Sequence, residues 1–129
     1  MEDAELTPDD INYINAHATG TEWNDKNETK AIKEVFGQCA YKIPVVGNKA
    51  ALGHSIAGSG ALELIGCVLS LRDQVVPPTI NYKMPDPECD LDYVTEGKRN
   101  VRLQNVMSNS FAFGGSNAVL IVGAYEPKI

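Results

Sequence analysis

The amino-acid sequence predicts an α/β fold with a mixed sheet. Residues 11–15 and 43–46 are short apolar segments typical of strands, and each precedes a segment with helical character. Two further apolar segments, within residues 101–110 and 118–124, close the chain with only a short link between them. The order strand, helix, strand, helix favours parallel pairing in the first half, and the short link favours a closing antiparallel hairpin.

The first expected helix follows a loop of small and polar residues around Gly20. We expect Asn24 or Asp25 to cap it, because their side chains can accept from the first free N–H groups of a helix. Gly37 is expected to end it, since glycine tolerates the left-handed conformation found after helix ends. The apolar face of this helix consists of Ala31, Ile32, Val35 and Phe36.

The second expected helix, over about residues 57–72, is apolar almost all round, and Glu63 interrupts the pattern. Such a helix is normally buried on most sides. A chain of 129 residues has little need for a doubly buried helix, so we expect a partner or another part of a longer protein to cover one face. The prolines between residues 77 and 87 then indicate a long irregular surface connection.

Composition indicates one globular domain with an acidic surface. Eleven Lys and Arg against seventeen Asp and Glu give a net charge of −6, which argues against a nucleic-acid module. No apolar run approaches the roughly 18 residues of a membrane span, and the acidic start lacks the features of a signal peptide. Cys39, Cys67 and Cys89 are widely spaced without a CxxC motif, which favours free thiols in a reducing, cytoplasmic compartment.

The two histidines, His17 and His54, each stand where an expected strand gives way to a Gly-rich turn, and Lys49 lies close to the second. Ligands of α/β sheets bind at the carboxyl ends of strands. A lone histidine is more often structural, and that interpretation stays open here. Two of them at equivalent strand ends favour a pair of neutral imidazoles that donate to one developing oxyanion.

Other site chemistries fit less well. Gly53 and Gly58 have P-loop spacing, but Ser59 and Gly60 follow where Lys and Ser or Thr are required, and the dinucleotide-binding glycine pattern also fails. Two histidines in unrelated loops lack the spacing of metal ligands, so no metal is expected. Cys67 lies in the apolar helix, as an inert core thiol does.

Several segments resemble the C-terminal part of an elongating β-ketoacyl-acyl-carrier-protein synthase, over essentially the whole chain. The resemblance rests on their joint order and spacing. The segments are Tyr13-Ile14-Asn15-Ala16-His17-Ala18-Thr19-Gly20-Thr21, Lys49 with Gly53-His54, Leu71-Arg72-Asp73-Gln74, Cys89-Asp90-Leu91-Asp92-Tyr93-Val94, and Ser108-Asn109-Ser110-Phe111-Ala112-Phe113-Gly114-Gly115.

The resemblance implies a thiolase-like fold of two similar halves stacked in five layers, with a helix buried between sheets. Residues 1–129 would be an incomplete C-terminal half, and the N-terminal half with the nucleophilic cysteine would be absent. The expected activity of the complete protein is decarboxylative condensation of malonyl-carrier protein with an acyl thioester, in fatty-acid or polyketide synthesis. The chain alone is expected to be inactive, because a ping-pong condensation needs the thiolate.

The resemblance also assigns roles to individual residues. His17 and His54 would donate to the thioester oxygen, and Lys49 would orient the second histidine, His54, electrostatically. The residues expected to line the phosphopantetheine channel and its gate are Thr19, Thr21, Phe111, Phe113, Gly114 and Gly115. Glu63 and Asn109 would be structural groups beside the site.

The expected partners are an acyl carrier protein, the N-terminal half and, in the complete enzyme, a second copy. The substrate would arrive on the carrier's phosphopantetheine, with no further cofactor. Two histidines, where initiating enzymes have His and Asn, imply the elongating class. Two alternatives stay open: part of a non-condensing malonyl decarboxylase, and a non-catalytic partner subunit.

The chain departs from the pattern it resembles at a few positions near the expected site. Ala18 stands where glycine is usual, and Gly47 and Asn48 replace Ser and Thr before Lys49. Ala112 replaces a glycine in the expected gate. None of these changes removes a catalytic group. We expect them to alter the channel and the gate.

Overall fold

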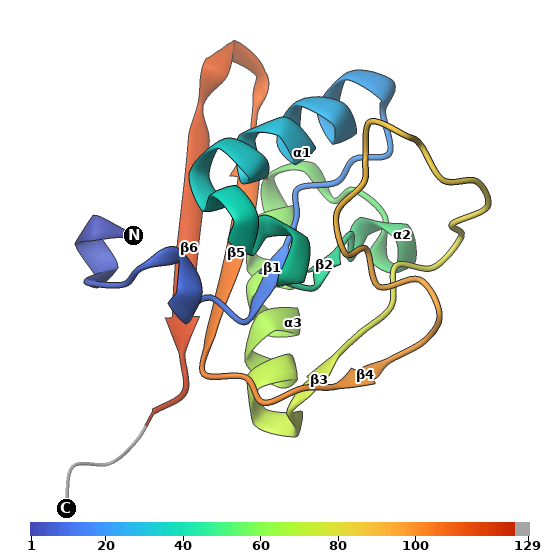
Figure 1. The fold of residues 1–129 in the computed structure, drawn as a ribbon. Coiled ribbons are helices and arrows are strands. Elements are labelled where there is room, and N and C mark those ends of the chain that lie inside the picture. Colours follow the sequence, from blue (N-terminus) through green and yellow to red (C-terminus); the bar gives the residue numbers. More distant parts are fainter. Residues whose placement is uncertain (126–129) are drawn as a thin grey trace, which may run out of the picture.

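The computed structural model describes residues 1–125, which form a four-stranded mixed sheet in the order β2-β1-β5-β6 (Figure 1). The strands are β1 (Tyr13–Asn15), β2 (Val45–Val46), β5 (Asn105–Phe111) and β6 (Asn117–Gly123). Strand β1 pairs in parallel with both β2 and β5, whereas β5 and β6 pair antiparallel along their whole length. The predicted mixed sheet with a closing hairpin is therefore confirmed.

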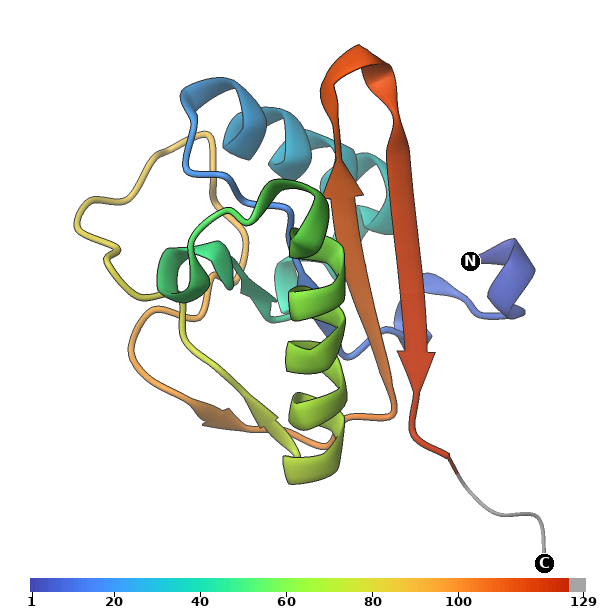
Figure 2. The same ribbon diagram turned by 180° about the vertical axis from the view of Figure 1, so that it is seen from behind.

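Two long helices cover opposite faces of this sheet, α1 (Glu22–Phe36) on one and α3 (Ser59–Asp73) on the other (Figures 1 and 2). Alternate residues of β1 supply the two resulting cores. Ile14 packs in the cluster that includes Ile32 and Phe36 of α1, and Tyr13 packs in the cluster that includes Cys67 of α3. Because a core lies on each face of the sheet, all three residues of β1 are buried.

The remaining elements are short. They are η1 (Glu2–Ala4), η2 (Pro8–Asp10), η3 (Gly37–Lys42), α2 (Lys49–Leu52), η4 (Ile56–Gly58), η5 (Phe113–Gly115), β3 (Val75–Val76) and β4 (Arg99–Asn100). The antiparallel pairing of β3 with β4 was not predicted. The connection after β3 is irregular as predicted, and Lys26–Glu88 and Lys33–Asp90 ion pairs attach it to α1.

The predicted cap of α1 was wrong. The helix begins at Glu22, and the hydroxyl of Thr21 accepts from the N–H of Asn24 at 3.3 Å. Thr21 takes this place because its backbone is extended, as an N-cap requires, while Asn24 is already helical. Gly37 ends the helix as predicted, but its φ of 55° and ψ of −128° differ from the left-handed helical conformation that was expected.

The apolar faces of both long helices are only partly covered. On α1, Ile32 and Phe36 are buried, but Ala31 and Val35 are exposed, contrary to prediction. On α3, one side packs on the sheet and the outer side is bare. Its bare residues are Leu62, Ile65, Val68 and Leu69, with exposed fractions of 42–56%. No helix among the described residues is long and apolar enough to cross a bilayer.

Candidate active site

The carboxyl ends of the parallel strands β1, β2 and β5 lie at one edge of the sheet (Figure 1). His17 follows β1, Lys49 opens α2 just after β2, and Phe111 ends β5. His54 lies in the turn that leads into α3. Parallel strands bring their ends to one edge, which is why residues nearly a hundred positions apart in sequence become neighbours.

The two imidazoles lie close together. Their ring centroids are 5.7 Å apart with the planes at 89°, and the ring of Phe111 lies 5.5 Å from that of His17. The expectation that the two rings converge is confirmed by this geometry. Their catalytic role stays a prediction.

Lys49 determines which nitrogen of His17 carries the proton. Its ammonium donates to the backbone carbonyl of His17 at 2.7 Å and lies 3.3 Å from Nδ1 of the same residue. An ammonium has no acceptor, so Nδ1 must be the acceptor and the proton of the neutral ring sits on Nε2. The carboxylate of Glu63, almost fully buried, pairs with the same ammonium.

His54 has the same tautomer for a different reason. Its Nδ1 accepts from the backbone N–H of Ile56 at 3.1 Å and lies 3.0 Å from the hydroxyl of Ser59. The neutral ring therefore also carries its proton on Nε2. Both imidazoles thus keep an Nε2–H available as a donor, which is the requirement for joint stabilisation of one oxyanion.

The surroundings keep His17 uncharged at neutral pH. Burial lowers its pKa to about 4, and the neighbouring charges of Lys49 and His54 act in the same direction. Burial raises the pKa of Glu63, and the contact with Lys49 opposes that rise. A neutral imidazole beside a buried ammonium is a hydrogen-bond donor with a fixed orientation.

Glu28 is the functional candidate that the sequence interpretation missed. Its buried carboxylate accepts from the N–H groups of His17 and Ala18 at 2.8 and 2.9 Å, and from the side-chain amide of Asn109 at 3.1 Å. It thereby holds the loop after β1 and strand β5 together. The sequence did hold a signal, because Glu28 stands four residues before Ile32 and so on the buried face of α1. A buried carboxylate is costly unless it is hydrogen-bonded, so its presence there indicates such partners.

Of the residues expected to line the channel and gate, Phe111 lies beside His17, whereas Thr21 lines a separate pocket described below. The hydroxyls of Thr19 and Thr21 share a hydrogen bond of 3.0 Å. The Phe113 side chain is fully exposed at the tip of the hairpin, so it contacts neither imidazole. Gly114 and Gly115 have φ values of 81° and 80°, a conformation that favours glycine.

The three thiols lie in surroundings that suppress their reactivity. Burial raises the pKa of Cys67 to about 11 and also raises that of Cys89. A hydrogen bond to the carboxylate of Asp9 raises the pKa of Cys39. A nucleophilic cysteine needs a depressed pKa, so none of the three fits that role.

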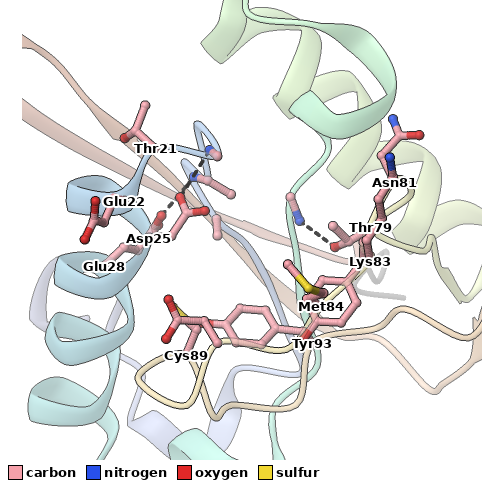
Figure 3. A pocket seen from close by; sticks show the side chains of 16 residues that line it. Thr21, Glu22, Asp25, Glu28, Thr79, Asn81, Lys83, Met84, Cys89 and Tyr93 are labelled. Atoms are coloured by element: carbon pink, nitrogen blue, oxygen red, sulfur yellow. Dashed lines mark hydrogen bonds between the residues drawn. The ribbon is translucent and has the colours of Figure 1, made fainter.

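A separate pocket of about 440 Å³ lies on the other side of the loop after β1 (Figure 3). Ala16, Ala18 and Gly20 line it, whereas the alternating residues His17 and Thr19 do not. Figure 3 shows carboxylates of α1 on one wall and the irregular connection after β3 on the other. This hollow is therefore distinct from the histidine cluster.

Comparison with known proteins identifies the family of the chain. The family model described as β-ketoacyl synthase, C-terminal domain, matches residues 1–83. The chain belongs to this family. Nodulation protein E of Rhizobium meliloti is 49% identical over 120 residues, which are 93% of this chain and 30% of that protein. The 3-oxoacyl-[acyl-carrier-protein] synthase 2 of Coxiella burnetii is 46% identical over 122 residues, or 95% of this chain and 30% of the relative.

Solved structures give the same result. A type II polyketide acyl-carrier protein in complex with its ketosynthase matches with a TM-score of 0.94 and 38% identity, over 97% of this chain and 31% of that chain. A β-ketoacyl synthase from Burkholderia phymatum matches with a TM-score of 0.90 and 36% identity, over 97% and 30%. The thiolase-like fold is thus confirmed, and the chain spans about 30% of the length of the curated relatives it matches.

Proposed function

We propose that this chain acts as the C-terminal catalytic portion of an elongating 3-oxoacyl-acyl-carrier-protein synthase. The observation that carries the proposal is the pair of imidazoles, with ring centroids 5.7 Å apart, whose Nδ1 atoms face the ammonium of Lys49 and the N–H of Ile56. The substrate would be a malonyl group held as a thioester on the phosphopantetheine of a carrier protein. One similar solved structure holds an acyl-carrier protein in complex with its ketosynthase.

In this reaction the bond between the malonyl carboxylate and its α-carbon breaks and carbon dioxide leaves. The electron pair passes onto the thioester oxygen as an enolate, and the Nε2–H groups of His17 and His54 donate to that oxygen. The enolate carbon then attacks an acyl thioester, and a thiolate leaves. Preorganised donors of this kind typically contribute a rate factor of about 10²–10³ each.

The acyl thioester needs a nucleophile that this chain does not offer, because burial or hydrogen bonding raises the pKa of Cys39, Cys67 and Cys89. We therefore propose that the nucleophile belongs to the N-terminal portion that the relatives carry. The bare outer side of α3 supports this assignment, since its apolar residues would be covered by that portion. The isolated chain would then catalyse no condensation.

The test is a chimera in which this chain replaces the matching C-terminal portion of the Coxiella burnetii synthase. We expect the chimera to decarboxylate malonyl-carrier protein and to condense it, while the isolated chain does neither. His17→Ala should lower decarboxylation by at least about 10²-fold. Lys30→Ala, on the exposed side of α1, is the matched control and should leave the rate unchanged.

Undiminished decarboxylation in His17→Ala would contradict the proposed role of the pair and favour a non-catalytic partner subunit. Decarboxylation without condensation, in a chimera that retains the relative's cysteine, would favour the non-condensing decarboxylase.

A further inference from the structure

Gly47 and Asn48 connect β2 to Lys49. Gly47 lies against Ala18, in the loop after β1, and Asn48 contacts Asn15 of β1 on the opposite face of the sheet. On the pocket side, a Cβ added at Gly47 would lie 2.9 Å from the Cβ of Ala18, closer than real Cβ atoms approach. The absence of a side chain at Gly47 therefore makes room for the methyl group of Ala18. Ala18 itself has a φ of 37°, an unusual value for alanine, so its backbone is held in place by its neighbours.

The two positions are complementary. The methyl group of Ala18 fills the space that a side chain at position 47 would need. The backbone bond from Ala16 N–H to the carbonyl of Val46, at 2.9 Å, joins the two strand ends just before this contact.

On the opposite face, Asn48 begins a buried chain of side-chain amides and a hydroxyl. Its Nδ2 donates to Oδ1 of Asn15 at 2.8 Å, and Nδ2 of Asn15 donates to the hydroxyl of Ser108 at 3.0 Å. All three side chains are buried, and they link the end of β2 to β1 and β5. A Cβ at Gly66 of α3 would lie 3.3 Å from the same Nδ2, so the helix approaches closely as well.

We propose that Gly47 and Asn48 are positioning residues that set Lys49 against His17 and so keep the proton of His17 on Nε2. The proposal rests on the proposed function. Lys49 is the next residue in the chain, and its ammonium reaches both the carbonyl and Nδ1 of His17. A shift of the turn that carries Lys49 would therefore break both contacts.

The proposal predicts a change in the pKa of His17 that a purely structural role would not produce. The charged and titratable groups around His17 are Lys49 from α2, His54 from the turn before η4, Asp25 and Glu28 from α1, and Glu63 from α3. Burial is the largest cause of the lowered pKa of His17 and the charge of Lys49 is the second, so displacement of the ammonium would let that pKa rise above about 4. A titration of His17 followed by NMR would record this rise.

The experiment compares Gly47→Ala, Ala18→Gly and the double variant in the chimera, measuring malonyl decarboxylation at pH 7 and the pKa of His17 by NMR. Gly47→Ala should lower the rate by about 10- to 100-fold, as expected for misplacement by an ångström, and raise the pKa of His17. The double variant should recover to within about threefold, because the clash is gone. Gly60→Ala is the control, since its added methyl would meet only the hydroxyl of Ser110 at 3.8 Å.

A parental rate and a parental pKa of His17 in Gly47→Ala would overturn the proposal, and so would a double variant as impaired as Gly47→Ala. Should Gly47→Ala fail to fold, Asn48→Leu removes the donor at similar size, and an unchanged pKa of His17 there would equally overturn it. A parental chimera without any decarboxylation would refute the proposed function instead. The pKa of His17, measured by NMR in the same variants, then decides on the positioning role.

Discussion

The two imidazoles differ sharply in how this chain supports them. His17 is 7% exposed and is held by the ammonium of Lys49 and the carboxylate of Glu28, which come from two other elements. His54 is exposed, and its hydrogen-bond partners, Ile56 and Ser59, lie within five residues of it. His17 is thus held by contacts with distant parts of this chain. His54 has contacts only with its sequence neighbours, as expected if the proposed N-terminal portion covers it.

The largest effect is expected from breaking the buried ion pair behind His17. Lys49→Met leaves the carboxylate of Glu63 buried without its counter-charge, which should cost about 3–5 kcal/mol of unfolding free energy. Urea unfolding of the chimera measures this cost. Lys49→Met combined with Glu63→Gln should recover part of the loss, and a double variant no more stable than Lys49→Met would contradict the pairing.

A smaller loss is expected from Glu28→Gln, which tests the second support of His17. The amide replaces one acceptor oxygen by a donor that faces backbone N–H groups, at a cost of about 1–3 kcal/mol. Glu22→Gln is the matched control on the same helix, because its side chain is 79% exposed. It should change stability by less than about 0.5 kcal/mol. Equal effects of the two substitutions would show that Glu28 does not hold the loop.

The pKa of His17 predicts a dependence of stability on pH. The folded state has a pKa of about 4 and the unfolded chain about 6.5, so the unfolded state takes up the proton first as pH falls. Stability is therefore present above pH 6.5 and is lost between pH 6.5 and 4, by about 1–3 kcal/mol for the full shift. Thermal unfolding of parental protein and His17→Gln across this range measures the difference, and parallel curves would contradict the lowered pKa.

The smallest effect is expected on the side of His54. Ser59→Ala removes one contact of Nδ1, but the N–H of Ile56 still occupies that nitrogen and keeps the proton on Nε2. The decarboxylation rate should change by less than about threefold, since the donor remains in place. A loss comparable to that of His17→Ala would mean that Ser59, and not the backbone, orients this ring.

Patterns of local sequence predicted the strands, both long helices and the hairpin, because alternation and apolar stretches report burial directly. The cap of α1 was misassigned, since Thr21, Asn24 and Asp25 are all competent caps and only the backbone angles select one. Val35 was expected to be buried and is exposed, because its burial depends on which elements pack against α1. The β3–β4 pairing joins segments of two residues each, too short to leave a periodic signal.

The sequence predicted that His17, Lys49 and His54 come together, but it assigned Lys49 to His54, whereas the ammonium contacts His17. His17, Lys49 and His54 stand out as chemical groups at strand ends, and the ends of parallel strands converge. The carboxylate of Glu28 and the amide chain through Asn48 act across the sheet, over separations of up to 93 positions. Contacts of that kind follow from the packed fold and have no local pattern.

The most direct test measures which nitrogen of each imidazole carries the proton. ¹⁵N NMR on the histidine-labelled chimera at pH 8 reports this. The variants His17→Gln and His54→Gln assign the signals. The contacts of Lys49 and Ile56 predict that both rings carry the proton on Nε2. A proton on Nδ1 of either ring would contradict a shared donor pair.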